Sequence, residues 1–113
     1  MELSVRNEKK LCVISVQSAR IDASVALQFK DAMRAHSGGE AERILLDLSA
    51  VDFIDSSGLG AIVAAMKSME EHRKLMLAGF TPAVERVFRL TRMDTVFRIF
   101  PTLEGALDTL GAE

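Results

Sequence analysis

The segment DFIDSSGLGAIVAAM, residues 52–66, places two hydroxyl groups between a short strand-like run and a helical run. Ser56 and Ser57 stand directly after Asp55 and before Gly58. Aspartate and serine side chains commonly accept hydrogen bonds from the unpaired amides at the start of a helix, so helix capping is the simplest role for these residues. Hydroxyl groups at such a position could also bind phosphate, act as nucleophiles, or accept phosphate from another enzyme.

Each of these three chemical roles requires a different sequence feature. A phosphate-binding loop would need G-x-x-x-x-G-K-[ST] or G-x-G-x-x-G, which this segment lacks, and Asp52 and Asp55 would repel the anion. A hydrolase serine would need a G-x-S-x-G elbow and a histidine base, whereas His36 and His72 fall near predicted helix ends. A serine that another enzyme phosphorylates needs only to be accessible, and it gains about −1.5 to −2 charges. Capping and phosphorylation stay open, while we predict no catalytic residue, cofactor or metal ligand.

The elements that position these hydroxyl groups alternate between strand-like and helical patterns. Strands are predicted at residues 3–5, 11–16, 43–48, 74–80 and 96–100. The run at 43–48 is almost continuously apolar, as in a strand buried on both faces, and Pro101 predicts an edge position for the last strand. Helices are predicted after Ser24 and after Thr102, each as a helix cap, and also after the serine pair and after Thr81-Pro82. The first of these helices is expected to end at Gly38-Gly39. This order predicts an α/β fold with a mixed, mostly parallel sheet of about five strands and about four helices.

The composition of the chain indicates which classes of protein and of binding partner to expect. The chain has 113 residues, of which 49% are hydrophobic and 27% charged, and we expect one domain over residues 1–113. A formal net charge of −2 gives no electrostatic reason to expect nucleic acid or an anionic membrane as a partner. No apolar run is long enough to span a bilayer, and the N-terminus does not resemble a signal peptide, so we expect a cytoplasmic protein.

Some conspicuous side chains have ordinary structural explanations. Cys12 lies within an apolar run, which predicts a buried, unreactive thiol, and a single cysteine cannot form an internal disulfide. Two methionines lie on the apolar stripe of the predicted central helix and are interpreted as core residues: Met66 and Met69. Four arginines near the C-terminus are interpreted as a solvated face: Arg86, Arg89, Arg92 and Arg98.

Two stretches resemble a known family. LLDLSAVDFIDSSGLGAIV, residues 45–63, closely resembles the central motif of bacterial anti-sigma factor antagonists, the single-domain STAS proteins. In that family an apolar strand ends in a D-S-[ST]-G-L-G turn that opens a helix. RIDASVALQFKDAM, residues 20–33, resembles the family's second-strand exit and first helix, where G-x-[LIV]-D is usual and Ala19 here replaces the glycine. The resemblance covers essentially the whole chain and favours the STAS fold.

The resemblance implies a partner switch carried out by a protein that is not itself an enzyme. The unmodified protein binds a serine-kinase anti-sigma factor, a histidine-kinase-like ATPase, which then phosphorylates the serine after the aspartate. The phosphorylated protein is released, and a PP2C-type phosphatase removes the phosphate. Carried over to this sequence, the acceptor is Ser56. The alternative is a STAS domain that serves as a scaffold or subunit in a stress-sensing or lipid-transport complex.

The same resemblance assigns roles around the acceptor. Ser57 matches the second position of the motif and is expected to serve the start of the helix. Phe53 and Ile54 are expected to contact the partner. The residues expected to border the site are Asp22, Asp55, Ser57, Gly58, Leu59 and Gly60.

Overall fold

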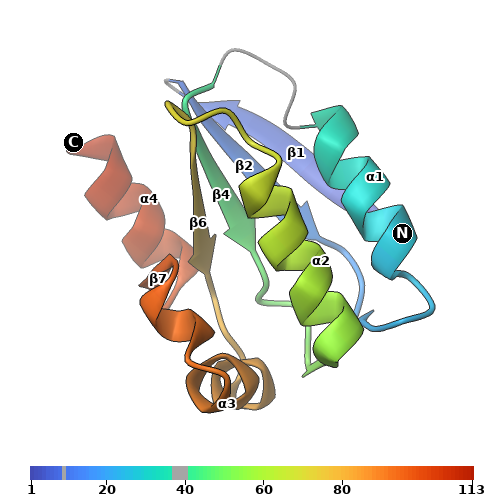
Figure 1. The fold of residues 1–113 in the computed structure, drawn as a ribbon. Helices are drawn as coiled ribbons and strands as arrows, with labels where there is room; N and C mark the ends of the chain where they lie inside the picture. The colour runs from blue at the N-terminus through green and yellow to red at the C-terminus, as the bar shows by residue number, and fades with distance from the viewer. Residues whose placement is uncertain (9, 37–40) are drawn as a thin grey trace.

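A five-stranded sheet with helices on both faces forms the body of the computed structural model, which describes residues 1–8, 10–36 and 41–113 (Figure 1). The strands are β1 (Leu3–Glu8), β2 (Leu11–Val16), β3 (Arg20–Ile21), β4 (Arg43–Asp47), β5 (Phe53–Ile54), β6 (Lys74–Ala78) and β7 (Arg98–Phe100). The α-helices are α1 (Ala26–His36), α2 (Ser56–Lys67), α3 (Pro82–Leu90) and α4 (Leu103–Gly111), and η1 (Met93–Thr95) is a 3₁₀ turn. The predicted mixed α/β fold is confirmed.

The main sheet has the strand order β1-β2-β4-β6-β7. β1 pairs antiparallel with β2, and the other neighbouring strands are parallel. β7 lies at an edge, as the proline directly after it predicted. Because the parallel strands all point the same way, the segments that follow them gather at one end of the sheet, where α2 and α3 begin.

Two hydrophobic clusters fill the space between the sheet and its helices. Figure 1 shows α1 and α2 side by side on one face, and their cluster includes Phe29, Met33, Leu59 and Ile62. We call this the α1–α2 face. The α4 face carries the second cluster, which includes Ala106 and Leu110. β4 supplies residues to both clusters, so the prediction of a strand buried on both faces is confirmed.

A second, two-stranded parallel sheet joins β3 to β5, and the sequence pattern did not predict it. Its register pairs Arg20 with Phe53 and Ile21 with Ile54. The carbonyl of Ala19 accepts hydrogen bonds from the amides of Asp52 (2.8 Å) and Phe53 (3.2 Å). Ala19 is not among the described residues with a positive φ, so alanine fits this turn without strain. The pairing holds the segment before α1 against the segment before α2.

The start of α1 differs from the prediction. The helix begins at Ala26, and Ser24 lies in the preceding turn instead of capping the helix. Both the amide (3.1 Å) and the hydroxyl (2.6 Å) of Ser24 donate to Asp22 Oδ1. An aspartate that accepts hydrogen bonds from the residue two positions later forms an Asx turn. Because the hydrogen-bond donors of Ser24 are used in this turn, the serine does not cap α1. The predicted end of α1 at Gly38-Gly39 lies outside the described residues.

Strand ends also differ from the predicted ranges. β6 ends at Ala78 because Gly79, with a φ of 77°, leaves the extended conformation. β7 begins only at Arg98, because Val96, which caps the 3₁₀ turn η1, has helical backbone angles (φ −88°, ψ −31°). The predicted cap Thr102 is confirmed, because its side chain accepts from the amide of Gly105 (3.0 Å). No helix among the described residues has the length and apolar character needed to cross a membrane.

Candidate functional site

Asp55 caps α2 and therefore sets the position of both serines. Its backbone is extended, with φ −107° and ψ −175°, and its Oδ1 accepts from the amide of Gly58 (2.8 Å). The helix begins at Ser56, so Ser57 is already its second residue. Ser57, which was expected to serve the start of the helix, lies in its first turn, while Asp55 provides the extended backbone and the oxygen that a cap requires.

The second carboxylate oxygen of Asp55 ties the helix to the turn before α1. Oδ2 accepts from the amide of Ala23 (3.1 Å). In the same turn Asp22 accepts from Ser24 through Oδ1 and from Arg20 Nε through Oδ2 (3.2 Å). The hydrogen bond from the Ser24 hydroxyl does most to hold the pKa of Asp22 below its ordinary value, followed by that from Arg20 and then that from the Ser24 amide. The structure thus brings together two acidic residues that lie 33 positions apart in the sequence.

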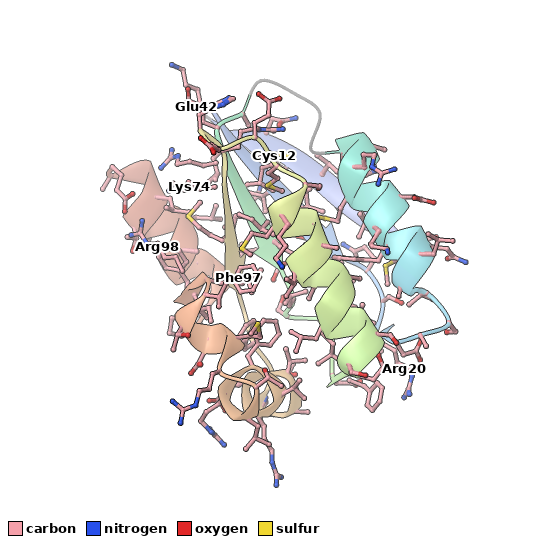
Figure 2. All side chains as sticks on the ribbon, in the orientation of Figure 1. Cys12, Arg20, Glu42, Lys74, Phe97 and Arg98 are labelled. Carbon is pink, nitrogen blue, oxygen red and sulfur yellow. The ribbon has the colours of Figure 1, made fainter. Side chains whose placement is uncertain are left out.

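Arg20 and Phe53 form an exposed pair on this rim. The Arg20 guanidinium carbon lies 4.0 Å from the centroid of the Phe53 ring, within the range of a cation–π contact. Phe53 is 37% exposed, whereas the neighbouring Ile54 is 4% exposed and belongs to the core. Of the two residues expected to contact a partner, only Phe53 therefore presents its side chain to solvent. The sequence analysis missed Arg20, which lies in a strand too short to show a pattern; Figure 2 shows it near the start of α2.

The serine hydroxyl groups are accessible. Ser56 and Ser57 are both exposed, and within the described part of the chain neither hydroxyl takes part in a side-chain hydrogen bond. They lie in the first turn of α2, where the helix dipole favours negative charge. The described residues contain no group of three His, Cys, Asp or Glu side chains that could hold a metal ion. This arrangement is suited to accepting a group from another molecule.

The glycines and the leucine of the motif have different structural roles. A Cβ on Gly58 would lie 1.9 Å from the carbonyl oxygen of Ile21, so only glycine lets α2 approach β3 this closely. A Cβ on Gly60 would meet nothing within 4 Å. Leu59 is 8% exposed and packs into the core. Gly58 and Leu59 therefore position the helix, whereas Gly60 lies on the exposed side of α2 and contacts no other element.

The motif, the fold and the geometry agree with a comparison against protein families. Residues 2–106 match the STAS domain family. The chain belongs to the STAS domain family. This STAS domain is 30% identical over 92 residues to an anti-sigma-B factor antagonist of Listeria monocytogenes, a match that covers 80% of each chain. It is 27% identical over 105 residues to the anti-sigma-F factor antagonist RsfB of Mycobacterium tuberculosis, which covers 93% of this chain and 85% of that protein.

Solved structures support the same family. The crystal structure of an anti-sigma factor antagonist from Mycobacterium paratuberculosis superposes with a TM-score of 0.85 and 30% sequence identity, covering 96% of this STAS domain and 92% of that chain. The fold also matches that of unphosphorylated SpoIIAA, with a TM-score of 0.76 and 21% identity over 99% of this chain and 98% of that one. Phosphorylated SpoIIAA from Bacillus matches with a TM-score of 0.69 and 20% identity over 96% of this chain and 99% of that one. The resemblance found in the sequence is confirmed.

Proposed function

We propose that this STAS-domain protein is an anti-sigma factor antagonist whose binding is switched by phosphorylation of Ser56. The observation that carries this proposal is the exposed Ser56 hydroxyl at the first residue of α2, directly after the capping Asp55 of a D-S-S-G-L-G motif. The names of the relatives agree with it, as does the existence of SpoIIAA in unphosphorylated and phosphorylated forms. The partner is a serine-kinase anti-sigma factor that uses ATP.

Binding uses the rim at the start of α2. Phe53 offers an exposed apolar ring, Arg20 lies over it, and Asp22 adds a hydrogen-bonded carboxylate. Their mutual contacts hold the rim in one arrangement before binding, which lowers the entropy cost of association. Docked there, the kinase reaches the Ser56 hydroxyl, which protrudes from the helix end.

Phosphorylation then weakens the contact. The Ser56 oxygen attacks the γ-phosphorus of ATP, its proton passes to a base on the kinase, and ADP leaves. The product carries about −1.5 to −2 charges next to Asp55. Repulsion and the desolvation of a dianion need to supply only ~3 kcal/mol to weaken binding about a hundredfold. Asp55 and Gly58 keep the helix start in place, so the switch requires no change of fold.

A separate phosphatase, of the PP2C type, completes the cycle. The chain itself catalyses neither step, since its site offers an acceptor hydroxyl and two carboxylates that already accept hydrogen bonds. The protein therefore acts through the surface it presents to its partners.

Phosphosite mapping with the cognate kinase tests this function. We expect the phosphate on Ser56, persistent kinase binding and no modification for Ser56→Ala, and weak binding for Ser56→Asp. Ser57→Ala is the matched control and should remain a substrate. Mass spectrometry and binding titrations of the three variants provide the measurement. Phosphate on Ser57, or equal affinity of the phosphorylated and unmodified proteins, would contradict the proposal.

A further inference from the structure

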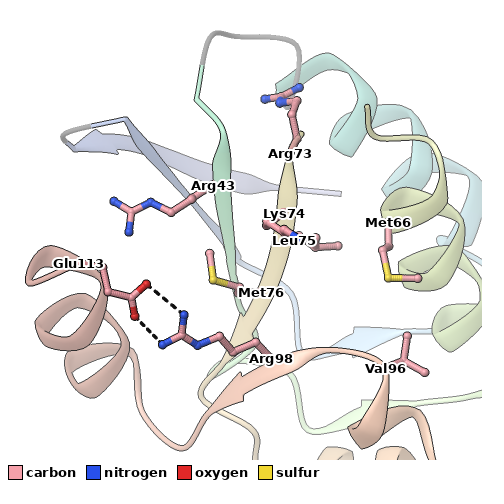
Figure 3. Close-up of a pocket in the computed structure, with 9 residues that line it drawn as sticks. All are labelled: Arg43, Met66, Arg73, Lys74, Leu75, Met76, Val96, Arg98 and Glu113. Carbon is pink, nitrogen blue, oxygen red and sulfur yellow. Dashed lines mark hydrogen bonds and ion pairs between the residues drawn. The ribbon is translucent and has the colours of Figure 1, made fainter. Parts of the chain in front are cut away.

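The two edges of the main sheet differ in how well they are protected. β7 has only three residues, Pro101 follows it, and its Arg98 donates two hydrogen bonds to Glu113 just after α4 (3.1 and 2.5 Å, Figure 3). β1 has six residues in an unbroken register with β2, and among the described residues no other strand pairs with it. Short length, proline and lysine commonly keep an edge strand from pairing with another chain. β1 has none of these features.

The backbone of β1 alternates between groups that bind β2 and groups that point away from it. In an antiparallel pair, opposite residues exchange backbone hydrogen bonds only at every second position. The amide of Gln17 donates to the carbonyl of Glu2 (2.9 Å), and these two residues continue the register between the strands. The pairs that include Leu3, Val5 and Asn7 are therefore the ones without hydrogen bonds to β2. The amide and carbonyl groups of these three residues face the open edge.

The side chains of β1 alternate between the two faces of the sheet. Leu3 and Val5 lie on the α1–α2 face, because their partners on β2 belong to that cluster. Leu3 packs against the cluster, whereas Val5 is 36% exposed. Glu2, Ser4 and Arg6 lie on the α4 face and are exposed. The edge therefore carries an apolar row on one face, and a polar row with one acid and one base on the other.

The helix beside this edge presents a neutral side to it. Gln28 of α1 accepts a hydrogen bond from the amino group of Met1 (3.0 Å), so this side of α1 lies next to the start of β1 (Figure 1). Ala32 and Ala35 follow Gln28 at helical spacing on the same side. The charged residues of α1 that line the groove to α2 lie on its other side. A second molecule can therefore approach β1 without meeting a charged helix face.

We propose that two copies of this chain pair through β1 in antiparallel orientation, with Ser4 of both copies on the two-fold axis. In this register Leu3 lies opposite Val5 of the second copy, and the two residues exchange the backbone hydrogen bonds that face the open edge. Glu2 lies opposite Arg6 of the second copy. The symmetry repeats both pairs, and the two sheets join into one of ten strands, five from each copy.

The chemistry of the edge makes a second copy the partner that fits it. Apolar pairs and pairs of opposite charge are both favourable when they lie directly across an antiparallel ladder. The register satisfies both at once, with Leu3 against Val5 on one face and Glu2 against Arg6 on the other. Arg6 already interacts within its own chain, and the five N–H donors of a guanidinium suffice for a second carboxylate. The two-fold axis closes the assembly at the dimer.

This dimer leaves both candidate phosphorylation sites accessible. The two copies of β2 run in opposite directions, so the rims at the start of α2 lie at opposite ends of the joined sheet. One dimer therefore offers two separate surfaces to the kinase. No residue of β1 belongs to the rim, so the pairing does not depend on the function of Ser56.

Analytical ultracentrifugation of the full chain under reducing conditions, from micromolar to millimolar concentration, tests the association. We expect the sedimentation coefficient to rise with concentration from that of a monomer to that of a dimer. Val5→Lys should weaken dimerisation at least about tenfold, because it places a charge opposite Leu3 at both ends of the contact. Val96→Lys is the matched control: Val96 is 46% exposed and precedes β7, and its replacement should leave dimerisation unchanged.

A cysteine on the two-fold axis tests the register. Ser4 pairs with itself at a position without backbone hydrogen bonds, where the Cα atoms of opposite residues lie about 4.5 Å apart, close enough for a disulfide. With oxidised glutathione, Ser4→Cys should form a covalent dimer faster than Lys30→Cys on the exposed surface of α1. Cys12 is 3% exposed and does not compete for the oxidant.

Three results would overturn the proposal. The first is a chain that stays monomeric over the whole range of concentration. The second is a Val5→Lys variant that dimerises as tightly as Val96→Lys. The third is a Ser4→Cys variant that forms the covalent dimer no faster than Lys30→Cys.

Discussion

At the scale of single residues, one carboxylate organises the candidate site. Asp55 accepts the amide of Gly58 through one oxygen and the amide of Ala23 through the other. The first contact starts α2, and the second fixes that start against the turn before α1. Because the aspartate fills the capping role, Ser56 and Ser57 are left with exposed hydroxyl groups. The two serines are therefore available for chemistry and contribute little to the helix start.

This division of roles predicts different stabilities for two alanine variants. Asp55→Ala should lower the free energy of unfolding by about 1–2 kcal/mol, the usual cost of a lost cap. Ser57→Ala should change it by less than about 0.5 kcal/mol, as for an ordinary surface residue. Urea unfolding followed by circular dichroism measures both. A Ser57→Ala loss as large as that of Asp55→Ala would show that the serine shares the cap.

The hydrogen bonds of Asp22 predict its titration. The Ser24 hydroxyl lowers the pKa most, and the hydrogen bonds from Arg20 and then from the Ser24 amide lower it further, so the folded pKa lies below the ordinary value. Because the folded pKa is depressed, this stabilisation is present at neutral pH and is lost as the pH falls through the folded pKa. NMR titration of the carboxyl carbon should show a higher pKa in Ser24→Ala and a smaller rise in Arg20→Gln. An unchanged pKa in Ser24→Ala would contradict the assignment.

At the scale of elements, the packing of α2 against β3 places the rim. The carbonyl of Ile21 lies where a Cβ on Gly58 would be, so the helix contacts the strand through its backbone. The same approach lets β3 pair with β5 and holds Arg20 over Phe53. A small change at this contact would therefore displace several residues of the rim at once.

Two glycine substitutions in α2 should have opposite effects. Gly58→Ala should lower the free energy of unfolding by about 3 kcal/mol, because the backbone of β3 has to move away from the added methyl group. Gly60→Ala meets no neighbour and should raise it by up to about 1 kcal/mol through helix propensity. Thermal and urea unfolding of both variants provide the comparison. A tolerated Gly58→Ala would mean that α2 is not held against β3 as described.

At the scale of the whole molecule, the parallel sheet separates two surfaces. The rim at the start of α2 lies at the carboxyl ends of the strands, and a cleft lined by Arg43, Lys74 and Arg98 lies at their amino ends. Between them the two hydrophobic clusters hold residues such as Cys12, which is 3% exposed and lies on the α1–α2 face (Figure 2). Desolvation by burial raises the pKa of its thiol.

The reactivity of Cys12 reports on this core as a whole. The thiolate is the reactive form, and both burial and the raised pKa suppress it. At neutral pH we expect alkylation of the folded protein to be at least about a hundredfold slower than that of the urea-unfolded chain. Cys12→Ser serves as the unlabelled control. Similar rates in the folded and unfolded states would show that the α1–α2 face opens readily.

The amino-acid sequence by itself determined most of the local elements and the D-S-S-G-L-G motif. Apolar runs predicted the inner strands β2, β4 and β6, since a strand buried on both faces must be apolar along most of its length. Thr102 and Pro82 marked the starts of α4 and α3, because the groups that open a helix act within a few residues. The D-S-S-G-L-G motif is contiguous and was visible without coordinates.

Only the tertiary structure decided which distant residues meet. β3 and β5 have two residues each, too few to show a periodicity, and their pairing depends on how the chain returns after α1 and β4. Aspartate and serine are equally good helix caps, so the sequence does not decide which residue of the motif caps α2. The extended backbone of Asp55 decides it. Arg43, Lys74 and Arg98 lie far apart in the chain, and they line one cleft only because the register of three parallel strands brings them together.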